Sequence, residues 1–180
     1  MKSAERERTA YHEAGHAVLA HYLCTGFKSV TIAADHDSAG HVLSVNESDP
    51  DVENLHLTAA DAFWQRKAIG LYAGAEAVRH KWPKSHWKLG AGNDYHWAGI
   101  ALEKITNDAQ VLRALHAYAS RTARLAVVRH WSEIEHVALA LLKARTLNAD
   151  AVRAAIHASI SRRIGSEMSV KLRKGAKRTA

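Results

Sequence analysis

The chain has 180 residues, of which 47% are hydrophobic, with one cysteine and two prolines. This length and composition predict one compact domain and exclude a low-complexity or disulfide-stabilised protein. The first ten residues are charged and no uninterrupted run of 18 apolar residues occurs, so we expect no secretory signal, no membrane span and a cytoplasmic location. Because Cys24 sits inside an apolar helix in this sequence pattern, we expect it to be a core residue.

The net charge of +7 is concentrated at one end of the chain. Residues 162–180 contain seven basic residues and one acidic residue, which leaves 18 basic and 17 acidic residues before them. We therefore expect residues 1–161 to form the domain and residues 162–180 to form a flexible basic tail. We expect this tail to be solvated. The alternative is that the tail contacts nucleic acid, in which case its deletion should abolish DNA binding.

Residue periodicity and turn signals predict a mainly α fold with a small β-hairpin, or edge strand, after the first helix. The expected elements are a helix over 5–25 ended by Gly26, strands over 28–33 and 41–45, helices over 59–78 and 94–105, a helical stretch over 109–144 with a break near 130–132, and a helix from Asn148 to Gly165. The connection over 81–93 carries Trp82 and Trp87, and either lines a pocket or packs as a surface loop.

The segment AYHEAGHAV places His12 and His16 four residues apart, with Glu13 directly after the first. Side chains at i and i+4 of a helix lie one turn apart on one face, so two imidazoles can bind one ion at about 2.0–2.1 Å. A glutamate at i+1 can reach a water held by that ion, as in the H-E-x-x-H zinc hydrolases. Although the chain has 13 histidines, we expect only about 0.05 chance matches to this motif.

The apolar surroundings of the motif strengthen the prediction of a metal site. Two imidazoles and a carboxylate among Ala, Val and Leu side chains are costly to bury unless each finds a partner, which a divalent cation provides. Gly15, inside the same helix, predicts close packing beside the site. Catalytic zinc has three protein ligands, and spacing alone leaves four candidates for the third: His41, His86, Asp94 and His96.

Five segments, in the same order along the chain, resemble the zinc metallopeptidase domain of FtsH-type proteases. The segments are ERERTAYHEAGHAVLAHYL, VTIAADHDSAGHVLSV, LYAGAEAV, GAGNDYHWAGIAL and VALALLKARTLNADAVRAAI. The resemblance covers roughly residues 5–160 and implies a helical peptidase domain with one Zn²⁺ per chain. It places the ligands on His12, His16 and Asp94, and it makes Glu13 the general base for a water at the metal.

The resemblance also implies roles for residues away from the ligands. Glu76 would orient a ligand histidine, unless it is only a helix-surface carboxylate. The strand residues His41, Val42 and Leu43 would pair with an extended substrate backbone, unless they form only a packed hairpin.

Members of that family carry an N-terminal membrane anchor and an ATPase module, whereas these 180 residues contain no apolar span and no G-x-x-x-x-G-K-[ST] motif for ATP. We therefore expect a zinc metalloendopeptidase that is not ATP-dependent on its own, and that cleaves extended or unfolded polypeptide segments unless a separate ATPase or delivery partner supplies substrates. The alternative is a non-catalytic metal-binding module, regulatory or adaptor in role, that retains the peptidase fold.

Overall fold

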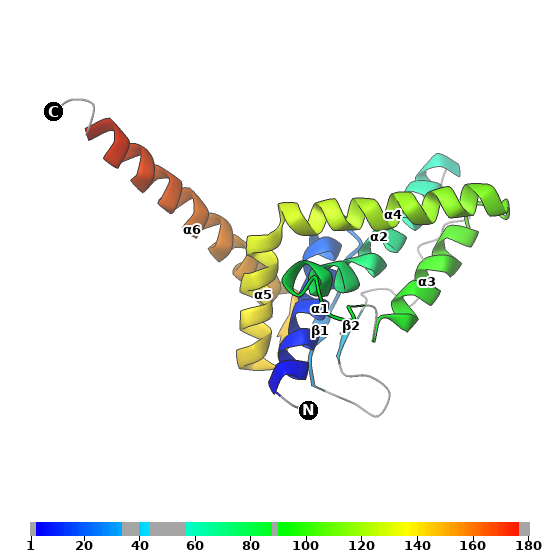
Figure 1. Cartoon of the computed structure of the whole chain (residues 1–180), viewed down its shortest axis with the longest axis horizontal. Helices are drawn as coiled ribbons and strands as arrows, with labels where there is room; N and C mark the ends of the chain where they lie inside the picture. Colours follow the sequence, from blue (N-terminus) through cyan, green and yellow to red (C-terminus); the bar gives the residue numbers. More distant parts are fainter. Residues whose placement is uncertain (1–2, 34–39, 44–56, 88–89, 177–180) are drawn as a thin grey trace.

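The computed structural model describes residues 3–33, 40–43, 57–87 and 90–176. This part of the chain is mainly helical with one small antiparallel sheet, which confirms the predicted fold class (Figure 1). The elements in chain order are α1 (Ser3–Tyr22), β1 (Ser29–Thr31), β2 (His41–Leu43), α2 (Leu57–Lys81), α3 (Gly92–Glu103), α4 (Ala109–Arg129), α5 (Trp131–Ala144), β3 (Thr146–Asn148) and α6 (Ala149–Ala176).

Helix α1 runs through the interior and packs against both α2 and α5. Most of its second half is buried, because small and apolar residues occupy most of its circumference. The expected helix over 5–25 is confirmed, but it ends three residues earlier than expected, at Tyr22, and Gly26 lies in the connection that follows, with a φ of 70° that glycine tolerates without a steric penalty. The expectation for Cys24 is wrong: it is exposed, since α1 ends at Tyr22 and Cys24 lies in the following turn with a φ of 55°.

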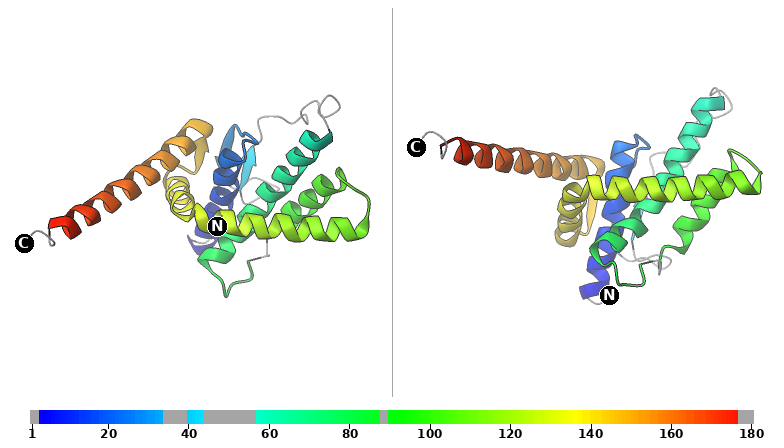
Figure 2. Two further views of the ribbon diagram at one scale, coloured as in Figure 1. Left: turned by 90° about the horizontal axis from the view of Figure 1, so that it is seen from above. Right: turned by 45° about the horizontal axis from the view of Figure 1, so that its top comes forward.

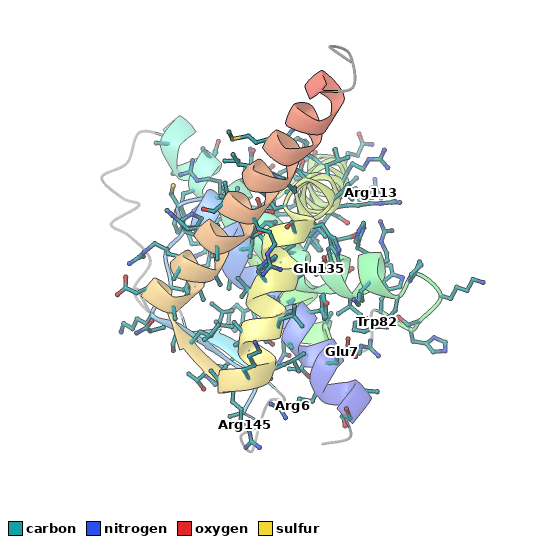
Figure 3. The ribbon with its side chains drawn as sticks, turned by 90° about the vertical axis from the view of Figure 1, so that its left-hand side faces the viewer. Arg6, Glu7, Trp82, Arg113, Glu135 and Arg145 are labelled. Carbon is teal, nitrogen blue, oxygen red and sulfur yellow. The ribbon has the colours of Figure 1, made fainter. Side chains whose placement is uncertain are left out.

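An aromatic contact fixes how α1 sits between its neighbours. The ring of Tyr11 stacks on Trp131 at the start of α5, with centroids 5.6 Å apart, and meets Trp82 after α2 edge-on at 5.5 Å. The guanidinium of Arg6, a residue labelled in Figure 3, donates to the carbonyl oxygen of Leu142 near the end of α5. These contacts fix the rotation of α1 about its own axis. They therefore also fix the direction in which His12, the residue directly after Tyr11, points from the helix.

The sheet has the strand order β2-β1-β3, with both pairings antiparallel. Val30 at its centre is opposite Val42 on one side and Leu147 on the other. The predicted hairpin is therefore confirmed, whereas β3 was not predicted. The expected turn between the two strands lies largely at residues 34–39, and the expected extension of the second strand to residue 45 lies within residues 44–56; both are outside the described residues.

The predicted break in the long helical stretch is confirmed, because α4 ends at Arg129 and α5 begins at Trp131. Asn148 caps α6 by accepting a hydrogen bond from the amide of Ala151 at 2.8 Å, also as predicted. The prediction that Gly165 ends this helix is wrong, since α6 continues to Ala176 and extends away from the body (Figure 2). One glycine costs a helix only about 1 kcal/mol, so favourable neighbours outweigh it.

Among the described residues, no helix is both long enough and apolar enough to cross a lipid bilayer.

Candidate metal centre

Two side chains of α1 converge on one point. The Nε2 atoms of His12 and His16 lie 3.1 Å apart, and the two rings meet edge-on with centroids 4.7 Å apart. Both side chains are mostly buried, at 17% and 12% exposed. The helical spacing thus produces the convergence that the sequence indicates.

Asp94, in the first turn of α3, completes the cluster. Its Oδ2 atom lies 3.0 Å from Nε2 of His12 and 3.4 Å from Nε2 of His16. The next residue, Tyr95, packs edge-on against Tyr72 of α2 with ring centroids 5.1 Å apart, which ties the start of α3 to α2. The structure therefore brings together the three residues proposed as ligands, although they come from two distant parts of the chain.

The other candidates for a third ligand lie elsewhere. Within the described part of the chain, His12, His16 and Asp94 form the single group of three or more potential metal ligands. His86 and His96 are exposed, and His96 packs against the ring of Trp97.

Helix α2 leaves room for the two imidazoles at a glycine. A Cβ on Gly74 would overlap Nε2 of His16 and would lie 2.8 Å from both Cε1 and Nε2 of His12. Gly15 permits a similarly close approach, since a Cβ there would lie 2.7 Å from the carbonyl oxygen of Ala73. The close packing predicted at Gly15 is confirmed. The role of Gly74 was missed, although a glycine inside the resembling segment LYAGAEAV was a signal for it.

A backbone contact orients one ligand histidine. Nδ1 of His16 lies 2.9 Å from the carbonyl oxygen of Gly70, which can only accept a hydrogen bond. The hydrogen on this ring is thereby assigned to Nδ1, and Nε2 presents its lone pair to the cluster when the ring is neutral.

The charges within the cluster are strongly coupled. Burial by itself lowers the pKa of His16, but the Asp94 carboxylate beside it, Glu13 and the Gly70 carbonyl outweigh burial and raise it to about 9. Burial by itself raises the pKa of Asp94, but the two histidines hold it well below its usual range. In the absence of a cation, therefore, a proton on the imidazoles stabilises the Asp94 carboxylate.

Glu13 lies beside the cluster without belonging to it. Its side chain is buried, at 4% exposed, and burial raises its pKa even though His16, His12 and His41 oppose that change. The chain also approaches Glu13 closely just before β2, where a Cβ on Gly40 would lie 3.1 Å from Cγ of Glu13. Glu13 is thus close both to the proposed ligands and to the start of the edge strand.

The strand expected to bind substrate is an edge of the described sheet. His41, Val42 and Leu43 form β2, which pairs with β1 along one side. His41 is exposed, and its charge influences Glu13.

Glu76 makes a different contact from the one suggested by the resemblance. Its carboxylate is 3% exposed and lies 2.9 Å from Nε of Arg79, one turn further along α2. Gly70, rather than Glu76, provides the hydrogen-bond acceptor for the ring of His16. Orientation of a ligand histidine by Glu76 remains a prediction.

No protein-family model matches the chain, and no curated protein shows significant similarity to it. Functional inference therefore depends on the site itself.

The donor set fits a divalent zinc ion. Two imidazole nitrogens and one carboxylate oxygen are the ligand types of several catalytic zinc sites. In a tetrahedral site with bonds of about 2.0–2.1 Å, neighbouring ligand atoms are about 3.3 Å apart. The three separations of 3.0, 3.1 and 3.4 Å among His12, His16 and Asp94 are close to that value.

Proposed function

We propose that this chain is a zinc-dependent endopeptidase that hydrolyses peptide bonds in extended or unfolded polypeptide segments. The observation that carries the proposal is the convergence of His12 Nε2, His16 Nε2 and Asp94 Oδ2 beside the buried carboxylate of Glu13. Three ligands leave a fourth tetrahedral position for water or substrate, which distinguishes a catalytic zinc site from a structural one.

In this proposal His12, His16 and Asp94 would hold one zinc ion through Nε2, Nε2 and a carboxylate oxygen. Bound zinc supplies Lewis acidity, which polarises a substrate carbonyl and makes a nearby water more acidic. The hydrogen bond from His16 Nδ1 to the Gly70 carbonyl keeps the ligand nitrogen directed at the cluster, so this residue needs little reorganisation to bind.

Glu13 is the proposed general base. A carboxylate next to the ligand cluster can accept a proton from the attacking water and later deliver that proton to the leaving amine. Burial raises the pKa of Glu13, and a higher pKa brings a carboxylate closer to the value at which it accepts a proton effectively near neutral pH.

The edge strand β2 is the proposed binding surface for the substrate backbone. An extended peptide can add to a sheet edge through main-chain hydrogen bonds, which recognise its backbone rather than its sequence. The start of β2 approaches Glu13 through Gly40, so a peptide paired along this edge would run beside the proposed base. This mode of binding requires an extended segment and favours unfolded over folded substrates.

The test is zinc-dependent cleavage of an unfolded, fluorophore-labelled casein by wild type, Glu13→Gln and the control Glu5→Gln. Glu5 is exposed in the first turn of the same helix. We expect chelator-sensitive cleavage by wild type and by Glu5→Gln, and a loss of about 10²–10⁴-fold in Glu13→Gln. Elemental analysis should find one zinc per chain in all three proteins.

The result also separates this proposal from its alternative. One tightly bound zinc per chain without cleavage of the unfolded substrate would overturn the peptidase and would favour a non-catalytic metal-binding module. A chain that binds no zinc would overturn both.

A further inference from the structure

A second site lies on the opposite side of α2 from the histidine cluster. Glu76 and Arg79 of α2, Trp87 of the following loop, and Arg124 and Val127 of α4 line a cavity of about 350 Å³. Small-molecule sites begin at about 300 Å³, so the cavity is large enough for a compact ligand. We propose that it binds a small monocarboxylate with a planar apolar body.

The charged residues of the cavity favour an anion. Arg79 forms an ion pair with the buried carboxylate of Glu76, with Nε 2.9 Å from Oε2, and its guanidinium carbon lies 5.2 Å from the centre of the Trp87 ring. Arg79 therefore already occupies the place that a cationic ligand would take between this carboxylate and this ring. Burial raises the pKa of Glu76, and the charges of Arg79 and Arg124 partly oppose that rise, so Arg124 places a second positive charge near this carboxylate.

The number of charges favours a ligand with a single negative charge. With His80 counted as neutral, the two arginines and one glutamate give the lining a formal charge of +1. A carboxylate matches both this charge and the planar donor geometry of a guanidinium, which binds carboxylates through paired hydrogen bonds. Arg124 is exposed, so its guanidinium can bind such a ligand without first leaving the interior.

The remaining lining residues favour an apolar body on that ligand. Val127 and Val128 of α4 line the cavity together with Pro83 and the indole of Trp87 from the loop after α2, and the side chain of Val128 is 53% exposed. Apolar walls with a few convergent polar groups are typical of small-molecule sites. The sequence left open whether the connection over 81–93 lines a pocket or packs as a surface loop. Trp87 of this connection forms part of the cavity wall, whereas Trp82 packs on Tyr11.

The test is calorimetry or ligand-observed NMR with benzoate, using benzamide and acetate as comparison ligands. Benzamide keeps the ring without the charge, and acetate keeps the charge without the ring. A charge-assisted hydrogen bond is stronger than a neutral one, so we expect benzoate to bind about tenfold more tightly than benzamide. We also expect benzoate to bind about tenfold more tightly than acetate, because acetate leaves the apolar wall uncovered.

Two arginine variants on one helix assign the site. Arg124→Gln should weaken benzoate binding about tenfold. Arg121→Gln should leave binding unchanged, because Arg121 is exposed on the same helix but does not line the cavity. Glu76→Gln raises the formal charge of the lining from +1 to +2 and should strengthen binding.

The proposal is overturned if wild type shows no saturable binding of benzoate, if benzamide binds as tightly as benzoate, or if the two arginine variants weaken binding equally. Circular dichroism of each variant establishes that it is folded. None of these measurements requires zinc or proteolysis, so the proposal stands or fails independently of the proposed function.

Discussion

The ring of His16 on α1 and the backbone of Gly74 on α2 are in such close contact that a Cβ on Gly74 would overlap Nε2 of His16. The same Cβ would lie 2.8 Å from Nε2 of His12. The space for both imidazoles therefore depends on a missing side chain in the opposite helix, and this dependence can be tested by adding one methyl group.

We predict that Gly74→Ala lowers zinc affinity by about 10–100-fold, the range seen when groups that orient ligands are altered. The matched control is Gly70→Ala, because a Cβ at Gly70 meets no atom within 4 Å. Alanine is favoured over glycine inside a helix by about 0.5–1 kcal/mol, so Gly70→Ala should raise the free energy of unfolding. Calorimetric titration with zinc and thermal unfolding check both. Equal zinc affinity in the two variants would contradict the role assigned to Gly74.

The ligand pair on α1 could be predicted from the sequence, whereas the third ligand could not be chosen from spacing alone. His12 and His16 depend only on helical periodicity, which is a local property. Asp94 reaches them because α3 packs against α2, with Tyr95 against Tyr72, and no local pattern records such a contact. The resemblance to FtsH-type peptidases selected Asp94 from four candidates.

Strand β3 and the exposure of Cys24 were also not predicted, because neither is determined by a local sequence pattern. Strand β3 has three residues, too few for an alternating pattern, and is defined by its pairing with β1, more than one hundred residues earlier. The exposure of Cys24 depends on where α1 ends, and helix boundaries are the least reliable part of a prediction from sequence. Long helices with continuous apolar periodicity were predicted well because that signal is repeated over several turns.

We predict that zinc affinity rises with pH between about 7 and 9. Asp94 raises the pKa of His16 to about 9 in the absence of metal, and a histidine must lose its proton before it binds zinc. The apparent Kd should fall about tenfold per pH unit over this interval, with release of about one proton at pH 7. Titration calorimetry in buffers of different ionisation enthalpy measures both quantities. A pH-independent Kd would contradict this coupling.

The metal-free protein should show the opposite dependence on pH. Because the pKa of His16 is raised in the folded chain, its protonation stabilises the fold fully below the ordinary value of 6.5, and this contribution is lost as pH rises to about 9. Asp94→Asn removes the negative charge and should flatten the curve. Urea unfolding of the chelated protein at several pH values tests the sign. Stability that rises between pH 6.5 and 9 in wild type would contradict it.

We predict that Gly40→Ala impairs peptide cleavage more than zinc binding. A Cβ at this position would lie 2.7 Å from Cγ2 of Thr9, 2.8 Å from the carbonyl oxygen of Thr31 and 3.1 Å from Cγ of Glu13. Overpacking of this kind costs about 1–3 kcal/mol, and β2 would have to move away from Glu13. Comparison of kcat/KM with zinc affinity checks the prediction. Adding Thr9→Ser, which removes Cγ2, should restore part of the lost activity.

The outer half of α6 should be dispensable for the fold. Ser159 and Ile160 pack with the core, whereas residues 161–166 are all exposed and the helix projects from the body beyond them (Figure 1). We predict that a chain ending at Ile164 unfolds within about 2 °C of wild type, because few buried contacts are lost. A chain ending at Ala155 also loses the fully buried Ile156 and should be destabilised by about 2–5 kcal/mol or more. Equal melting temperatures for the two truncated chains would contradict this division of α6.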